Sequence, residues 1–329
     1  MLVKHVQFVA EQHHPVRVVQ PALGRREVVF RPIRHVFSLE RMITVYGEAL
    51  VDLVPSAPGP LAPLTAALGG GPFNVARALG RLGSPVAFQS RLSADTFGTA
   101  LRQSLLDAGV DLSRCPTGDE PTTLAVTSLL DDGSATYTFY VNGTADRLAE
   151  PEPVSDGYAV FGTLSLALEP GSLRYAGAAR ASADNGAIVC LDPNLRPAFM
   201  SEKHRLFLRG FLETTTVLKL STEETDFLGD TSHVPVVVTT LGGSGIRVRA
   251  PFGVAEVSAP SVQVADTIGA GDTVMAALVH QFDARGLDRD GLLALGEDEW
   301  CEILDFATRA AAITVSRTGA DTPYLHELG

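Results

Sequence analysis

The chain has 329 residues, 45% of them hydrophobic and 19% charged, a composition typical of globular proteins with one large or two modest domains. Its formal net charge of −12 argues against general binding to nucleic acid or to an anionic membrane, since both require an excess of Lys and Arg. No apolar run is long enough to span a bilayer, and no Gly-Lys-Ser/Thr sequence is present, which excludes a Walker-type phosphate loop. The three cysteines are widely spaced and lack His partners, so we expect buried thiols in a cytoplasmic protein, with neither disulfides nor a zinc site.

Residues 1–41 differ in composition from the remainder. They carry seven Lys or Arg against three acidic residues and hold four of the eight His. The continuous apolar core of a secretory signal is missing, and Ser38 is the only serine, which is fewer than a transit peptide usually has. We expect an N-terminal extension that is disordered or precedes the true start at Met42, with an organellar presequence as the alternative. Residues 42–329 are expected to form one domain.

Residues 43–47 predict a buried first strand, and Asp52 follows shortly after it. A carboxylate beyond the carboxyl end of a central strand suits ligand hydroxyls, although a solvated turn residue is equally compatible with this spacing. A Pro-rich loop is expected over 55–64. The sequence Gly69-Gly70-Gly71-Pro72-Phe73-Asn74 then leads into an amphipathic helix. It is not a dinucleotide fingerprint, because Asn74 takes the third glycine position and no strand is expected immediately before it.

A strand over 86–92 and a helix over 96–109 come next. Arg91 could reach an anionic ligand, but a structural role is the more common one for a single Arg beside a strand. Two alternating segments, 122–130 and 134–141, are joined by Asp131-Asp132-Gly133, which predicts a hairpin. We assign parts of 120–142 and of 52–68 to a small β-sheet lid, which would exclude water from a site beneath it.

From residue 157 onward, strands and helices alternate regularly. This pattern predicts an α/β fold, a mostly parallel sheet covered on both faces, with ligands at the carboxyl ends of its strands. The expected strands and helices are, in chain order, 158–161, helix 172–183, 187–191, helix 202–211, 216–219, 236–239, 245–249, helix 273–284 and helix 299–316.

Three of these strand ends carry residues suited to phosphate chemistry. Asn194 and Arg196 place an amide and a guanidinium after one strand, and planar Arg suits phosphate oxygens. Ser221 and Glu224 open a helix, where they also fit an ordinary capping box. The glycine-rich segment 240–245 would let a nucleotide approach the backbone, with a plain hairpin turn as the alternative.

The segment from Asp266 to Asp272 precedes a long apolar helix. Gly269 and Gly271 lack side chains, so backbone N–H groups can close on an anion where the helix begins. Asp272 at the rim of this phosphate site can accept a hydroxyl proton during phosphoryl transfer. The alternative is that Asp272 only caps the helix.

The string Asp266-Thr267-Ile268-Gly269-Ala270-Gly271-Asp272 resembles the C-terminal signature of the ribokinase-like (PfkB) family of sugar and nucleoside kinases. The segment from Gly69 to Asn74 resembles the family's N-terminal signature. The resemblance implies a three-layer α/β/α fold with a lid, Asp272 as catalytic base, and an anion hole built from Gly269, Ala270 and Gly271. It also implies that Asp52, Gly70 and Asn74 hold the sugar hydroxyls.

Further site residues follow from the same resemblance. Thr240, Gly242 and Gly245 would line the ATP site, and Glu224 would govern Mg²⁺. The family has Asn where this chain has Ser221, which leaves an Asn-specific contact in doubt. By analogy, Asp266 and Thr267 would offer oxygens to K⁺. Relatives often pair through their lids, which implies a homodimer.

Within the family, the segments around Glu48, Phe161, Asp192 and Lys219 look most like those of bacterial fructokinases. The implied reaction transfers the γ-phosphoryl group of ATP to the 6-hydroxyl of D-fructose. A kinase for 2-keto-3-deoxygluconate or another sugar is the alternative, since Arg91 and Arg196 could hold a carboxylate. A non-catalytic sugar sensor is a different class, but it would be expected to lose the base or the glycines.

Overall fold

The computed structural model describes residues 42–57, 59, 61–129 and 135–329. The N-terminal extension expected over 1–41 and the hairpin turn expected at 131–133 lie outside the described residues. No helix in these ranges is both long and apolar enough to cross a membrane.

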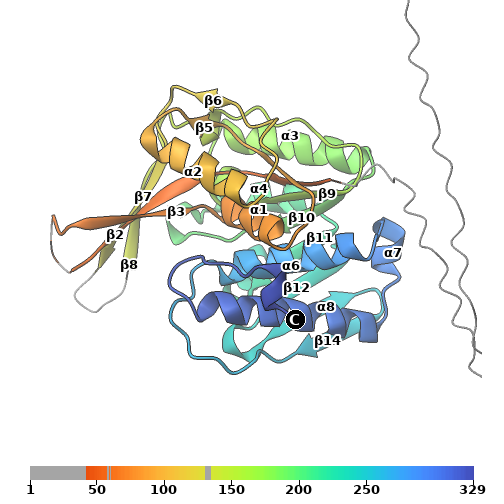
Figure 1. The fold of residues 1–329 in the computed structure, drawn as a ribbon. Coiled ribbons are helices and arrows are strands. Elements are labelled where there is room, and N and C mark those ends of the chain that lie inside the picture. Colours follow the sequence, from red (N-terminus) through yellow and green to blue (C-terminus); the bar gives the residue numbers. More distant parts are fainter. Residues whose placement is uncertain (1–41, 58, 60, 130–134) are drawn as a thin grey trace, which may run out of the picture. The chain divides into compact units, whose positions relative to one another are not determined.

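The main sheet has eight strands (Figure 1). They are β1 (Ile43–Tyr46), β4 (Val86–Gln89), β9 (Tyr158–Gly162), β10 (Ile188–Asp192), β11 (Val217–Ser221), β12 (Val236–Thr240), β13 (Ile246–Ala250) and β14 (Gly253–Val257). From edge to edge their order is β14-β13-β12-β11-β10-β9-β1-β4. The strands from β12 to β4 run parallel, and β13 and β14 continue the sheet as antiparallel strands. Short Val-, Ile- and Leu-rich runs form these strands because a parallel sheet is buried on both faces.

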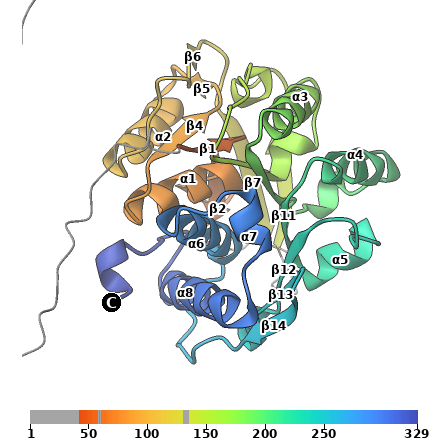
Figure 2. The ribbon, with the colours of Figure 1, turned by 90° about the vertical axis from the view of Figure 1, so that its right-hand side faces the viewer.

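Helices cover both faces of this sheet, as Figure 2 shows. They are α1 (Gly71–Arg81), α2 (Thr96–Asp107), α3 (Gly171–Asp184), α4 (Glu202–Leu212), α5 (Thr222–Leu228), α6 (Ala270–Ala284), α7 (Arg289–Leu293) and α8 (Glu297–Val315). Side chains alternate along each strand between two core clusters. Val217 faces the cluster built with α1, α2, α6 and α8, whereas Leu218 faces the cluster built with α3, α4 and α5. The expected three-layer α/β/α fold is thus confirmed.

A second, four-stranded sheet lies beside the carboxyl ends of the main strands (Figure 1). Its strands are β2 (Leu50–Pro55), β3 (Leu64–Gly69), β7 (Thr123–Leu129) and β8 (Ala135–Tyr140), in the order β3-β2-β7-β8. The β2–β7 pair is parallel and the other two pairs are antiparallel, so the sheet is mixed. A third, two-stranded sheet joins β5 (Leu92–Ser93) to β6 (Thr117–Gly118). The expectation of a small additional sheet is confirmed.

The structure differs from the sequence predictions at several elements. A strand, β3, does end immediately before α1, but it pairs antiparallel with β2 in the small sheet and is not part of a βαβ unit. The strand expected over 86–92 divides into β4 and β5. Strand β14 was not expected; it forms because Gly253, with φ of 134°, turns the chain back onto β13. Helix α7 spans five residues, too few for a clear helical period.

Candidate active site

The site is organised around the start of α6. Gly269, the N-cap residue, has φ of 77°, and a Cβ atom at this position would lie 2.6 Å from Cβ of Ala320. Only glycine fits both the left-handed conformation and this contact. Ala270 N donates to the Thr267 carbonyl oxygen at 3.4 Å, and the N–H groups of the first helical turn lie at the end of α6 where the helix dipole is positive. This arrangement suits a bound anion.

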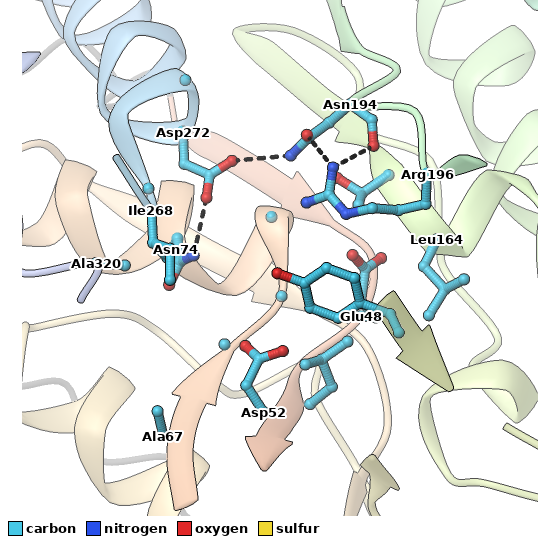
Figure 3. A pocket seen from close by; sticks show the side chains of 18 of the residues that line it. Glu48, Asp52, Ala67, Asn74, Leu164, Asn194, Arg196, Ile268, Asp272 and Ala320 are labelled. Carbon is cyan, nitrogen blue, oxygen red and sulfur yellow. Dashed lines mark hydrogen bonds between the residues drawn. The ribbon is translucent and has the colours of Figure 1, made fainter. Parts of the chain in front are cut away.

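Asp272 lies in the first turn of α6 and does not cap the helix, because Gly269 holds the N-cap position. Its Oδ2 accepts a hydrogen bond of 2.8 Å from Nδ2 of Asn74 in α1. Its Oδ1 accepts one of 3.2 Å from Nδ2 of Asn194, which follows β10 (Figure 3). Burial raises the pKa of Asp272 above its ordinary value, although the hydrogen bond from Asn74 and the charges of Lys219 and Arg196 oppose this shift.

A cavity of about 460 Å³ lies in front of Asp272, and we call it the polar cavity for the carboxylates among its lining residues. Its walls come from the carboxyl ends of the main strands, from the small sheet, and from the turn before α6. Nine residues singled out from the sequence line it: Asp52, Gly70, Asn74, Asn194, Arg196, Thr267, Gly269, Gly271 and Asp272. Segments more than 200 residues apart thus contribute to one site.

The cavity carries an excess of carboxylates. Glu48, Asp52 and Asp272 line it, whereas Arg196 is the only cationic side chain among the described lining residues. Burial raises the pKa of Asp52 to about 6, with Arg196 opposing the shift and Asp272 adding to it. Arg196 is itself held by hydrogen bonds from Nη1 to the backbone oxygen of Asn194, at 3.0 Å, and to its Oδ1, at 2.6 Å. Such a wall favours a neutral, hydroxyl-rich ligand over an anionic one.

A second cavity of about 460 Å³ adjoins the first. It is lined by Thr240, Gly242 and Gly245 and by the apolar side chains of Ile246, Val262, Val264 and Val274, among others. Thr267 and Gly271 line both cavities, which therefore meet at the turn before α6. Two ligands bound one in each cavity would meet at this turn, with Asp272 on the side of the polar cavity.

A model of the pfkB family carbohydrate kinases matches residues 40–327 of the chain. The chain belongs to the PfkB family of carbohydrate kinases. The fructokinase of Escherichia coli is 31% identical over 300 residues, which cover 85% of this chain and 95% of that protein. The Xylella fastidiosa fructokinase with bound ATP has a TM-score of 0.79 at 27% identity, covering 88% of this chain and 97% of that one. A fructokinase double mutant of Vibrio cholerae O395, bound to fructose, ADP and potassium ion, has a TM-score of 0.74 at 26% identity over 88% and 97%.

The predicted family is therefore confirmed, and the protein is an ATP-binding carbohydrate kinase. Identities near 30% do not fix which sugar this PfkB kinase takes. The residues that line the two cavities are the remaining guide to its substrate.

Ser221 and Glu224 line neither cavity of this kinase. They form the capping box that the sequence left open: Ser221 N donates to Glu224 Oε2 at 2.7 Å, and Glu224 N donates to Ser221 Oγ at 3.3 Å. Glu224 has a second contact, because Leu195 N donates to its Oε1 at 2.6 Å. Glu224 thus fastens the segment that carries Asn194 and Arg196 to the start of α5.

Two further residues singled out from the sequence lie outside the cavities of the kinase. Arg91 forms two hydrogen bonds with Glu120: its Nε donates to Oε2 at 3.0 Å and its Nη2 donates to Oε1 at 3.1 Å. Arg91 does not line the polar cavity. Asp266 stabilises the turn: Ile268 N donates to its Oδ1 at 3.0 Å and Gly319 N to its Oδ2 at 2.9 Å. The structure brings Thr267, but not the Asp266 side chain, to the cavities.

The kinase offers little that would hold a divalent ion by itself. Within the described ranges, no group of three or more His, Cys, Asp or Glu side chains could hold a metal. Both carboxylate oxygens of Glu224 already accept backbone N–H groups. This donor set fits an ion such as Mg²⁺, which keeps most of its waters and binds largely through nucleotide phosphates.

Some lining residues carried no signal in the sequence. Thr127, Tyr137 and Phe139 reach the polar cavity from the small sheet, and only the sheet pairing places them there. The structure also contains a buried ion pair between Lys219 and Asp192 that the sequence pattern did not predict. A lysine inside the otherwise apolar segment Val217–Leu220 is the signal that could have indicated it.

Proposed function

We propose that the protein is a fructokinase, which transfers the γ-phosphoryl group of ATP to the 6-hydroxyl of D-fructose with Asp272 as general base. The observation that carries this proposal is the position of Asp272, buried where the two cavities meet and held there by two side-chain amides. A carboxylate fixed in this way can accept a hydroxyl proton without reorganising.

In the proposed complex, fructose occupies the polar cavity. Asp52 and Asn74 would hold its hydroxyls beside Gly70, which also lines the cavity. Gly70 has to be glycine because it has φ of 106° and a Cβ there would lie 2.9 Å from the Glu48 carbonyl oxygen. ATP occupies the second cavity, with its base between the glycines after β12 and the apolar side chains of the opposite wall, and with Thr240, Gly242 and Gly245 beside it. Its phosphates would reach the turn at Gly269, Ala270 and Gly271.

The proposed step forms one bond and breaks one. The 6-hydroxyl oxygen attacks the γ-phosphorus, and the bond between that phosphorus and the β–γ bridging oxygen breaks, so that ADP leaves. Asp272 takes the hydroxyl proton. Backbone N–H groups of Gly269, Ala270 and Gly271 stabilise the charge on the transferring group, and Asn194 and Arg196 close the adjacent wall.

Two ions complete the proposal. Mg²⁺ bound to the phosphates would neutralise part of their charge. Glu224 would act on the ion only indirectly, because its Oε1 accepts a hydrogen bond from Leu195 N and so holds the segment that carries Asn194 and Arg196. K⁺ would bind near the turn, where Asp266 links residues 268 and 319. The Vibrio cholerae relative carries potassium in its structure, which supports this part of the proposal.

The charge of the cavity bears on the alternative sugar. Asp52, Asp272 and Glu48 line it beside one guanidinium, and burial raises the pKa of Glu48 to about 7, so this group is only partly charged near neutral pH. The carboxylate of 2-keto-3-deoxygluconate would still be repelled by Asp52 and Asp272 unless Arg196 paired with it. Arg91, the other cation considered from the sequence, is engaged by Glu120. A neutral sugar therefore fits better. A non-catalytic sensor is disfavoured because Asp272 and the glycines of the turn are present.

The test is ADP release by the full chain with Mg²⁺ and ATP, measured separately for fructose, ribose, 2-keto-3-deoxygluconate and adenosine. We expect turnover with fructose at a kcat/KM at least tenfold above that of the other acceptors. Faster turnover of another sugar would overturn the substrate assignment and leave the base assignment in place. Binding of sugar and ATP without any turnover would favour the sensor.

A further inference from the structure

A buried ion pair lies beneath the turn that precedes α6. Lys219 of β11 donates from Nζ to Oδ2 of Asp192 in β10 at 2.6 Å, and the two side chains are only 5% and 6% exposed. Val217 and Cys190, two residues earlier on each strand, belong to the core cluster under α6. Strand alternation therefore places Lys219 and Asp192 on this same face, at the carboxyl ends of adjacent strands.

The ammonium group reaches the backbone of the turn itself. A Cβ atom on Gly271 would lie 3.1 Å from Nζ of Lys219, so the ammonium sits directly against this glycine. Gly271 is also the residue that lines both cavities together with Thr267. The charge of Lys219 is thus next to the point where the two ligands would meet.

The surroundings of Lys219 keep it charged. Burial alone would lower its pKa, but the carboxylates of Asp192, Glu224 and Asp272 outweigh this effect and raise the pKa above its ordinary value. Lys219 is buried, whereas the Lys203 side chain is 86% exposed.

Packing alone does not account for this placement. A buried ammonium costs several kcal/mol of desolvation, and a buried ion pair is frequently no more stabilising than apolar side chains of the same volume. A cation at the N-terminus of a helix is further disfavoured by the helix dipole. Both penalties diminish when an anion binds at the helix start, because the ammonium and the N–H groups then act on the same negative charge.

We propose that Lys219 is a positioning residue for phosphoryl transfer: held by Asp192, its ammonium maintains positive charge beneath the Gly269–Gly271 turn for the transferring phosphoryl group. This inference rests on the proposed function, because it takes that turn as the phosphate site. Without Lys219, the ammonium next to Gly271 is lost, and the transferring phosphoryl group loses that local positive charge whether or not Asp192 remains charged.

Three variants test the proposal. Lys219→Met removes the ammonium and leaves Asp192 buried and unpaired. Lys219→Met/Asp192→Asn removes both charges, so that no unpaired charge is buried. Asp192→Asn is the matched control, since it keeps the ammonium and an oxygen that can accept its hydrogen bond. For each variant, kcat, the KM for sugar and the melting temperature are measured beside the wild type.

We expect kcat to fall roughly 10- to 100-fold in Lys219→Met, with the sugar KM changed less than about threefold. The double variant recovers melting temperature relative to Lys219→Met but not kcat, and Asp192→Asn keeps more of kcat than either. A purely structural role predicts the opposite, namely that kcat follows melting temperature and returns in the double variant. Recovery of wild-type kcat in the double variant would therefore overturn the proposal, as would an equal loss of kcat in Asp192→Asn and Lys219→Met.

The test remains decisive if fructose is not the substrate. The same kinetic comparison is then made with the sugar that the wild type does turn over. If no sugar is turned over, calorimetry measures binding of a non-hydrolysable ATP analogue with Mg²⁺. Weaker binding by both variants that lack the ammonium, but not by Asp192→Asn, supports the role of Lys219; equal affinity in all four proteins overturns it.

Discussion

The side-chain amide of Asn74 lies 2.8 Å from Oδ2 of Asp272, although 198 residues separate the two positions. One residue opens the first helix of the described chain and the other opens α6, and these two helices pack against each other. The amide N–H donates to this oxygen and so fixes the direction of the carboxylate, which means that α1 orients the proposed base. This hydrogen bond connects α1, which carries a proposed sugar-binding residue, to α6, which begins at the proposed phosphate site.

Replacing Asp272 with Asn is expected to lower kcat about 10²- to 10⁴-fold, because an amide cannot accept the hydroxyl proton. The sugar KM should change little, since the shape of the cavity is kept. Steady-state kinetics with Mg²⁺ and ATP measure both quantities. The matched control is Asp226→Asn, an exposed carboxylate on α5, which should retain wild-type kcat. A loss smaller than tenfold in Asp272→Asn would remove Asp272 from the role of base.

The acid limb of the kcat/KM profile is expected near pH 6, above the value of roughly 4 that is ordinary for aspartate. Burial raises the pKa of Asp52 to about 6 and also raises that of Asp272. Both groups are proposed to act as carboxylates, so activity is lost as pH falls through the raised pKa values and is full above them. In Asp52→Asn the limb should move to lower pH, because the group whose pKa is raised to about 6 no longer titrates. A wild-type kcat/KM profile whose acid limb lies near pH 4, the ordinary range for aspartate, would contradict this assignment.

Gly269→Ala is expected to reduce both stability and kcat. The added methyl group must adopt φ of 77° and would lie 2.6 Å from Cβ of Ala320, so the turn has to shift. The control is Gly83→Ala, which has φ of 80° but meets no atom within 4 Å. It should cost about 1 kcal/mol of unfolding free energy from the backbone alone and leave kcat unchanged. Equal kcat in the two variants would show that the turn does not contribute to transfer.

How far the sequence predicted this site depends on where each side chain points. The sequence assigned Asp272, Asn74 and Asn194 to roles in one site, and hydrogen bonds join them in the structure, because parallel strands and the helices after them present their polar ends at one sheet edge. Arg91 also follows a main-sheet strand, yet its direction is set by Glu120, a partner 29 residues away that no local pattern indicates. The Glu224 carboxylate similarly accepts hydrogen bonds from Ser221 N in the capping box and from Leu195 N. The contact with Leu195 could not be predicted, because it depends on how two loops pack against each other.

In the fold too, local sequence patterns predict some elements, whereas others depend on long-range pairing. Apolar runs of four or five residues indicated the main strands, because burial on both faces leaves a continuous signal. Strand β3 gave no such signal: it is largely exposed and is defined only by its pairing with β2. The lining side chains Thr127 and Phe139 could not be assigned for the same reason, since the register between β7 and β8 decides which face they occupy.

The two arginines considered from the sequence are expected to differ in effect. Arg196→Gln should lower kcat/KM about tenfold, because Arg196 lines the polar cavity and holds the Oδ1 of Asn194, whose amide contacts Asp272. Arg91→Gln should leave kcat/KM within about twofold, since its guanidinium is engaged by Glu120 outside the cavity. Kinetics on both variants with fructose measure this contrast. A large loss in Arg91→Gln would mean that Arg91 exchanges Glu120 for the substrate.

The homodimer implied by the family resemblance is expected to form through the small sheet. Its strands β3 and β8 lie at the two edges, and exposed apolar side chains are present on it: Leu64 is 47% and Tyr140 is 59% exposed. Unpaired edges and exposed apolar side chains favour association with a second copy. Light scattering coupled to gel filtration should give twice the chain mass of 34.8 kDa.

The variant Leu64→Lys/Tyr140→Lys should shift this mass toward that of the monomer, because it places charges on both edges of the sheet. Neither side chain is part of the proposed base, anion hole or nucleotide site. The kcat/KM of the variant therefore also tests whether dimer formation supports the lid over the sugar. The matched control is Leu173→Lys/Leu206→Lys, which replaces two similarly exposed side chains on α3 and α4. A dimer that survives the first variant but dissociates in the second would move the interface from the small sheet to the helical face.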